Sequence, residues 1–349
     1  RMSKKSPPSV VLSSGKSWFP GAYSDISVKK ERNGHMPNPY LPEGRLLSTP
    51  KNQAVCTCLS ALREAAGEEL ILEGRVLLCN ADHDLIVEVG PFTGRIPRSE
   101  AALGLAEGTT REIAVLSRVG KPVSFTVTAV LGTEEAPVLT LSRRRAQELA
   151  LSHCMQYLSP GTVVPATVTH LEPFGAFVDI GCGVVSMIGI ENISVSRISH
   201  PNRRFSVGQE IFAVVTGLDR SLGRVYLTHK ELLGTWMENA VPFAPGMTVS
   251  GYVRGVKEYG AFIELAPNLS GLAELRPDLV EGDRVSVYIK GIFPERMKIK
   301  LLIIDRLPPA GEPTALRYTV TSGRLKAWKY APDGCKKSGS ATVFNCGDA

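Results

Sequence analysis

A short motif that could bind nucleic-acid bases occurs twice in this 349-residue chain. Its first copy, Phe-Gly-Ala-Phe, occupies residues 174–177, and its second, Tyr-Gly-Ala-Phe, occupies residues 259–262. Each copy follows a Pro-Gly pair, at 160–161 and 245–246, and both the pairs and the motifs recur after 85 residues. An exposed aromatic ring can stack on an unpaired base, which contributes about 1–3 kcal/mol per base. The repeat therefore predicts two platforms for single-stranded nucleic acid.

The glycine in each motif is expected to decide where the rings point. Phe174 and Phe177 are three residues apart, so a regular strand would place them on opposite faces. Gly175 can adopt backbone conformations that other residues avoid, and a bulge there would bring both rings to one face. The same reasoning applies to Tyr259 and Phe262. A single aromatic residue on a strand is usually a core residue, but a repeated pair with a glycine favours an exposed platform.

Basic residues near the last predicted strand of each repeat could contact phosphate groups. In the first repeat, a turn begins at Asp219 and ends at Arg224. In the second, Arg296, Lys298 and Lys300 alternate with other residues, which would place them on one face of a strand. Such alternation is common on half-exposed strands. Beside aromatic rings, however, these cations favour a surface for stacking and phosphate binding.

Short runs of β-branched residues, separated by glycines, fall into three blocks with about five runs each. Five short antiparallel strands in a small block suit an oligonucleotide-binding (OB) barrel. We therefore expect an all-β protein with short helices, built from three tandem five-stranded OB-fold barrels. The expected parts are a disordered N-terminal segment (1–50), a short helix (51–69), the barrels (70–145, 160–232 and 245–305), helical bridges (143–157 and 230–240) and a short irregular C-terminal tail (306–349).

The net charge of +6 is concentrated at the N-terminus. The first 35 residues contain seven Lys or Arg and two Asp or Glu, whereas the remainder contains 33 basic and 32 acidic residues. The body is therefore close to neutral, and any affinity for nucleic acid must come from the sorting of charges onto one face. We expect the first 35 residues to add nothing to the fold. A natural start at Met36 and a genuine basic tail are both open.

No sequence feature indicates catalysis, a cofactor or a metal site. The six histidines are dispersed, and no P-loop or Rossmann fingerprint is present. The seven cysteines lack zinc-ligand spacing, and no run of 18 apolar residues occurs. We therefore expect a non-enzymatic cytoplasmic protein with reduced cysteines and no membrane span.

Blocks two and three resemble S1-type domains, the OB-fold RNA-binding module of a bacterial small-subunit ribosomal protein family. The resemblance rests on the motifs at 174–178 and 259–263, on the Pro-Gly strand starts and on the turns at 207–210 and 281–284. It implies a short family member with three tandem domains that captures single-stranded mRNA on the small ribosomal subunit and is a monomer off the ribosome. The family pattern implies RNA contacts at Phe174, Phe177, Asp219, Arg224, Tyr259, Phe262 and Arg296, to which the strand alternation adds Lys298.

The departures from the family pattern also carry expectations. The third-strand histidine of the family falls at Gly189 in block two and at Glu274 in block three, where a carboxylate would repel phosphate. Block one has Asp-His-Asp-Leu at 82–85 in place of the aromatic motif. We therefore expect block two to be the main RNA-binding domain and block one to be a degenerate module. Two alternatives stay open, an accessory protein of RNA processing or transcription and a protein-interaction scaffold with weakened RNA binding.

Overall fold

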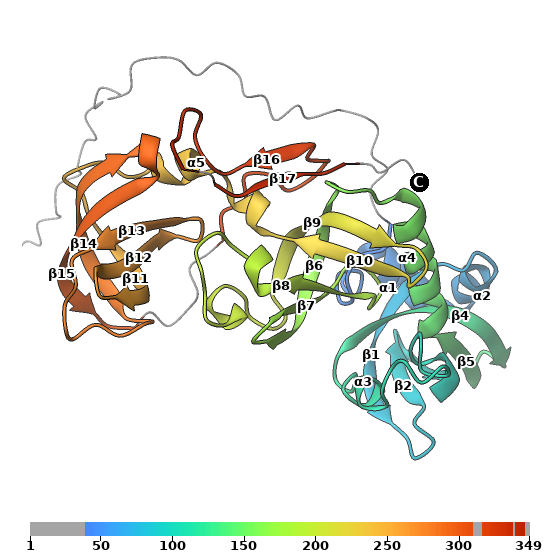
Figure 1. Ribbon diagram of the computed structural model, residues 1–349. Helices are drawn as coiled ribbons and strands as arrows, with labels where there is room; N and C mark the ends of the chain where they lie inside the picture. The colour runs from blue at the N-terminus through green and yellow to red at the C-terminus, as the bar shows by residue number, and fades with distance from the viewer. Residues whose placement is uncertain (1–38, 310–315, 338, 346–349) are drawn as a thin grey trace, which may run out of the picture. The chain divides into compact units, whose positions relative to one another are not determined.

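The computed structural model describes residues 39–309, 316–337 and 339–345 and contains three closed five-stranded β-barrels (Figure 1). The first barrel has the strand order β1-β2-β3-β5-β4. The second barrel (β6–β10) and the third barrel (β11–β15) repeat this order. The predicted fold class, an all-β protein with three tandem OB-type barrels, is confirmed.

The strands follow the same order in the three barrels. The first barrel consists of β1 (Leu72–Cys79), β2 (Leu85–Val89), β3 (Phe92–Ile96), β4 (Pro122–Gly132) and β5 (Pro137–Ser142). The second consists of β6 (Val163–Glu172), β7 (Gly175–Asp179), β8 (Val185–Gly189), β9 (Glu210–Asp219) and β10 (Arg224–Thr228). The third consists of β11 (Thr248–Lys257), β12 (Gly260–Ala266), β13 (Leu269–Ala273), β14 (Arg284–Phe293) and β15 (Lys298–Leu307).

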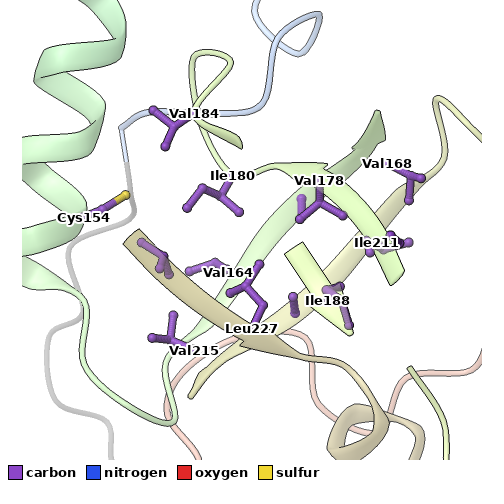
Figure 2. Packing of buried hydrophobic residues seen from close by; sticks show 14 of the residues in the cluster. Cys154, Val164, Val168, Val178, Ile180, Val184, Ile188, Ile211, Val215 and Leu227 are labelled. Carbon is purple, nitrogen blue, oxygen red and sulfur yellow. The ribbon is translucent and has the colours of Figure 1, made fainter. Parts of the chain in front are cut away.

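Each barrel closes around apolar side chains from alternate strand positions. In β8, for example, Ile188 is fully buried whereas Val185 and Met187 are exposed, as the two-residue period of a strand requires. The helix α4 (Arg143–Tyr157) adds Ala146, Ala150 and Cys154 to the core of the second barrel. Figure 2 shows this core, in which strand residues such as Val164, Val168, Val178, Ile211, Val215 and Leu227 meet.

The first strand of every barrel carries a bulge at the same place. The register shifts at residues 76–78 in β1, 168–170 in β6 and 253–255 in β11. An inserted residue bends a strand, so one strand can pair with two different neighbours. In each barrel the last strand then pairs in parallel with the third, which closes the ring. The shared register allows the three barrels to be matched position by position.

The helices connect and cover the barrels. The predicted bridge at 143–157 is α4, with those bounds. The helix predicted at 51–69 is two helices, α1 (Pro50–Cys56) and α2 (Leu59–Gly67), and the bridge predicted at 230–240 is η4 (Lys230–Leu233) followed by α5 (Trp236–Ala240). The remaining short helices are η1 (Arg98–Glu100), α3 (Ile113–Leu116), η2 (Ile190–Asn192), η3 (Pro201–Arg203) and η5 (Pro294–Arg296).

The segment before the first helix is more ordered than the sequence predicted. The expectation of little order before residue 50 is wrong for residues 39–49, and residues 1–38 lie outside the described part. The backbone N–H of Glu43 donates to the Asp179 carboxylate at 2.7 Å, and the Glu43 carboxylate accepts two hydrogen bonds from Arg143. These three side chains are buried, so the ion pair fixes the segment where composition alone indicated disorder.

The C-terminal segment also packs against the barrels. It contains a two-stranded sheet of β16 (Ala327–Lys329) and β17 (Ala341–Val343). Trp328 and Tyr330 join the core cluster of the third barrel, and Phe344 packs with Val163 of the second barrel. Among the described residues, no helix is both long and apolar enough to cross a membrane.

Candidate nucleic-acid interface

The rings of each repeated motif lie together on the outside of a barrel. Phe174 precedes β7 and is 55% exposed, and its ring centroid is 6.0 Å from that of Phe177 at an interplanar angle of 88°. Tyr259 precedes β12 and is 69% exposed, and its ring centroid is 6.1 Å from that of Phe262, also at 88°. The two barrels therefore present the same edge-to-face ring pair, with one face of the first ring open to solvent.

The motif glycine allows the neighbouring strand to approach closely and does not form a bulge. Pairing between β7 and β8 is regular from Gly175 onward, and the bulge lies on the neighbouring strand β6. The rings meet because Phe174 lies in the turn and not on the strand. A Cβ on Gly175 would lie 2.5 Å from the Ile188 carbonyl oxygen, and one on Gly260 would lie 2.4 Å from the Ala273 carbonyl oxygen. The expected bulge at the glycine is therefore wrong, although the expected meeting of the rings is observed.

Cross-strand pairing extends from Phe177 into an outward-facing row. Phe177 pairs with His170 on β6 and with Met187 on β8, and Met187 pairs with Tyr226 on β10. The His170 ring centroid is 6.2 Å from that of Phe177, and Met187 and Tyr226 are 41% and 48% exposed. We call these four residues the second-barrel row. His170, Met187 and Tyr226 were not predicted as site residues, and in the sequence only the alternation of the strand that contains Tyr226 points to its outward position.

The other barrels carry different side chains at the same register positions. The third barrel keeps one ring in its row, and the first barrel has no ring there. In the third barrel the positions are held by Gly255, Phe262, Leu272 and Lys300. In the first barrel they are held by Leu78, Ile86, Arg95 and Thr140.

The predicted cations flank these rows. The backbone of Arg224 pairs with that of Asp219 across the β9–β10 turn, and the Arg224 side chain is exposed. Within the described part of the chain, no hydrogen bond or ion pair holds its guanidinium. The Asp219 carboxylate accepts hydrogen bonds from the Ser221 hydroxyl at 2.6 Å and the Leu222 N–H at 3.0 Å, which lower the pKa of Asp219. Asp219 therefore holds the turn, and Arg224 is available to a ligand.

In the third barrel, Lys298 occupies the position that corresponds in register to Arg224 of the second barrel. Phe293 pairs with Lys298 as Asp219 pairs with Arg224. Arg296, to which the family pattern was transferred, lies before the strand in η5, with its exposed guanidinium 4.0 Å from the Glu295 carboxylate. Lys298 is thus the better match, and Arg296 extends the positive charge into the turn.

The place of the missing third-strand histidine differs between the barrels. A Cβ on Gly189 would lie 2.5 Å from the Glu191 carboxylate, so Glu191 occupies the space beside this glycine. In the third barrel, Lys290 lies 3.0 Å from the exposed Glu274 carboxylate. The repulsion of phosphate expected from Glu274 is therefore partly offset by its neighbour.

In the first barrel, ion pairs occupy the place where the other two barrels carry the aromatic motif. Asp84 accepts hydrogen bonds from the Arg95 side chain at 2.7 Å and from the Arg98 N–H at 2.8 Å. Burial raises the pKa of Asp84, but these hydrogen bonds outweigh it and the pKa is lowered overall. His83 contacts Glu112 at 3.2 Å, and Glu112 also pairs with Arg98. The aromatic platform is thus replaced by a charged network that is already satisfied.

Comparison with known proteins identifies the class to which this interface belongs. Residues 157–230 match the family model described as S1 RNA binding domain. The second barrel, with its ring pair and its flanking arginine, is therefore an S1 domain.

The chain as a whole is similar to small ribosomal subunit protein bS1. It is 29% identical to bS1 of Leuconostoc lactis over 272 residues, which covers 73% of this chain and 62% of that protein. It is 31% identical to bS1 of Staphylococcus aureus (strain COL) over 166 residues, which covers 44% of this chain and 42% of that protein. The matches thus span less than two thirds of the length of these relatives.

The solved structure of a multidomain protein with nucleic acid binding domains from Streptococcus pneumoniae is similar over 69% of this chain and 75% of that protein's chain. The identity is 14% and the TM-score 0.24, a likeness too low to support an argument.

Proposed function

We propose that this chain is an RNA-binding ribosomal protein that holds single-stranded mRNA on the small ribosomal subunit. The observation that carries the proposal is the exposed ring pair of Phe174 and Phe177, which continues into the second-barrel row. Beside this row lies Arg224, whose guanidinium has no ion-pair partner among the described residues. The match of this barrel to an S1 RNA binding domain and the similarity to bS1 support it.

The geometry acts by binding and requires no bond to be made or broken. Unpaired bases can stack on Phe174 and Phe177, because every base has a π-face. Cations at the start of the last strand, Arg224 in the second barrel and Lys298 at the matching place of the third, can contact phosphates of the same nucleic-acid strand. Base pairs in a duplex keep their faces covered by their neighbours, so the rings select single strands.

The three barrels are assigned different roles. The second barrel is the main RNA contact, and the third adds a weaker contact on the same chain, which raises the effective concentration of RNA at both. The first barrel, whose platform corner is closed by ion pairs, serves as a docking module. The protein would work in the cytoplasm, associated with the ribosome, as a monomer when it is off the ribosome and without a membrane or a cofactor.

Binding to RNA is tested with a fluorescent oligouridine and a matching duplex across a salt series. We expect tighter binding to the single strand. The second and third barrels are close to neutral, with six basic and six acidic residues in 160–232 and eight of each in 245–305. The logarithm of the affinity should therefore fall against the logarithm of salt with a slope of about −2 to −4, at about −0.7 per phosphate. Tighter duplex binding, or a much steeper slope, would contradict the ring platform.

Association with the ribosome needs a separate measurement. The full chain should co-sediment with purified small subunits. The Phe174→Ala/Phe177→Ala variant should still co-sediment but should have a reduced affinity for oligouridine. Binding to oligouridine without co-sedimentation would favour the accessory role in RNA processing or transcription. Co-sedimentation without any RNA affinity would favour the scaffold.

A further inference from the structure

The strand beside Tyr226 leaves an open surface in the second barrel. Gly217 on β9 pairs with Tyr226, and the nearest atom to a Cβ built on Gly217 is Cδ2 of the Tyr226 ring at 3.9 Å. That distance is ordinary van der Waals contact, so the space above Gly217 is empty of other side chains. In the described part of the chain, Tyr226 makes no hydrogen bond or ring contact and is 48% exposed. One edge and part of the face of this ring are therefore available to a ligand.

The same place is filled in the third barrel. Gly291 pairs with Lys300, as Gly217 pairs with Tyr226. A Cβ on Gly291 would lie 3.0 Å from the Phe293 ring, and the Lys300 ammonium lies 5.5 Å from the centroid of that ring. The aromatic side chain and the cation thus cover the glycine together.

A single position explains why the second barrel stays open. Phe293 corresponds in register to Asp219, because each pairs with the first residue of the last strand. The Asp219 carboxylate is directed into its own turn by Ser221 and Leu222 and is too short to cover Gly217. Gly217 is consequently half-buried beside a tyrosine in the second barrel, whereas Gly291 is buried beneath a phenylalanine in the third.

We infer that the second barrel has an additional base-stacking subsite, formed by Tyr226 beside Gly217, which the third barrel lacks. This inference rests on the proposed function. Met187 separates Tyr226 from Phe177 in the row, so the two rings are two strand spacings, or about 10 Å, apart. They therefore hold different nucleotides of one strand. Arg224, two residues before Tyr226 on the same outward face, would contact the phosphate next to this base.

The test is a series of oligouridines of increasing length, titrated against the full chain and its variants. Tyr226→Ala should bind the shortest bound oligomers like the wild type and bind longer ones about 5- to 100-fold more weakly, since one stacked base is lost. Tyr226→Phe should keep the wild-type length dependence. Gly217→Leu, which fills the open surface and leaves the ring in place, should reproduce the loss.

Two comparisons keep the outcomes distinct. Tyr288→Ala removes an exposed ring from β14 outside the rows and should change nothing, which controls for loss of a surface aromatic. If Tyr226→Ala and Gly217→Leu fold and bind every length like the wild type while Phe174→Ala/Phe177→Ala does not bind, the subsite is refuted and the proposed function stands. If that double variant also binds like the wild type, the ring platform and the proposed function fall together.

Discussion

The second and third barrels share strand order, bulge, motif glycine and an edge-to-face ring pair, yet they differ along the row that crosses their outer surface. The second barrel carries His170, Met187 and Tyr226 around its central ring. At two of these positions the third barrel carries Gly255 and Lys300. The barrel fold therefore fixes where a ligand can lie, and a few outward positions decide whether stacking or charge dominates there.

The first barrel extends this comparison. Its row contains Arg95, which is tied to Asp84, and its turn contains His83, which is tied to Glu112. The Asp84 carboxylate is buried, whereas His83 and Glu112 are partly exposed, and exposed ion pairs such as theirs typically contribute only about 0–1 kcal/mol to stability. Their main consequence is that the corner where the other barrels have rings is occupied and polar. The three barrels thus range from a stacking surface to a closed one on an unchanged scaffold.

Removal of both rings from each barrel in turn should give the largest difference. Phe174→Ala/Phe177→Ala is expected to cost about 2–5 kcal/mol of affinity for oligouridine, at about 1–3 kcal/mol per stacked base. Tyr259→Ala/Phe262→Ala should cost less, because the third barrel has fewer rings in its row. Both variants should keep the wild-type circular dichroism and melting temperature. Equal losses from the two double variants would show that the rows do not distinguish the barrels.

The cores of the two barrels should respond differently to acid. His229 is fully buried after β10, where the third barrel has Ile303, and burial lowers the pKa of His229 to about 4. Its Nδ1 donates to the Ile193 carbonyl oxygen at 2.7 Å and its Nε2 accepts from the Tyr318 hydroxyl at 3.1 Å, so the ring is held neutral. The unfolded chain binds a proton near pH 6.5 and the folded one does not, so stability is lost as the pH falls from 6.5 towards 4.

The contribution of His229 can be isolated by difference. As the pH falls from 7 to 5, protonation of His229 in the unfolded chain should lower the free energy of unfolding by about 2 kcal/mol. Urea unfolding of the wild type and of His229→Gln at both pH values measures this, because carboxylates that titrate in the same range are common to both chains. A pH dependence that is identical in the two chains would mean that His229 is protonated in the folded state.

The salt dependence should separate the cations of the two barrels. Arg224→Gln should reduce the magnitude of the salt slope by about 0.7, the value for one phosphate on a single strand. Lys298→Gln, at the matching position of the third barrel, should reduce it by less if the second barrel holds most of the RNA. Arg220→Gln is the matched control, because it also removes an exposed cation from the β9–β10 turn. The Arg220 guanidinium already donates a hydrogen bond to the Met155 carbonyl oxygen, so it is not expected to contact a phosphate. A larger change from Lys298→Gln would reverse the assignment of the main contact.

The sequence predicted the elements of this molecule better than the relations between them. The three blocks of β-branched runs identified the three barrels, the repeated motif identified the ring pairs, and the helical bridge predicted at 143–157 is α4 with its bounds. His170 and Tyr226 escaped notice because they join Phe177 only through pairing across strands, which no local pattern records. Arg296 was matched to Arg224 because the length of the last turn is not readable without the register.

The terminal segments escaped sequence analysis for a related reason. Glu43 is ordered by Arg143, 100 positions away, and composition carries no trace of such a contact. Trp328 and Tyr330 are buried against the third barrel, but the residues around them have no strand or helix period that would predict this burial. Local sequence patterns do not record order that depends on distant partners.

The smallest effect in the comparison should come from Glu274, where the third barrel has a carboxylate and the second has Gly189. Glu274→Gln, made in the Phe174→Ala/Phe177→Ala background, removes a negative charge beside the third-barrel rings and frees Lys290 from its 3.0 Å ion pair. Both changes favour a phosphate, but the groups are exposed and screened by salt, so the gain in affinity should be only about 2- to 3-fold and should vanish at high salt. Glu281→Gln removes an exposed carboxylate from the turn before β14 and is the matched control. Because it lies away from the row, it should leave the affinity unchanged. An equal gain from both variants would mean that net charge alone governs the third barrel, whereas a gain confined to Glu274→Gln would place the RNA backbone beside the third strand.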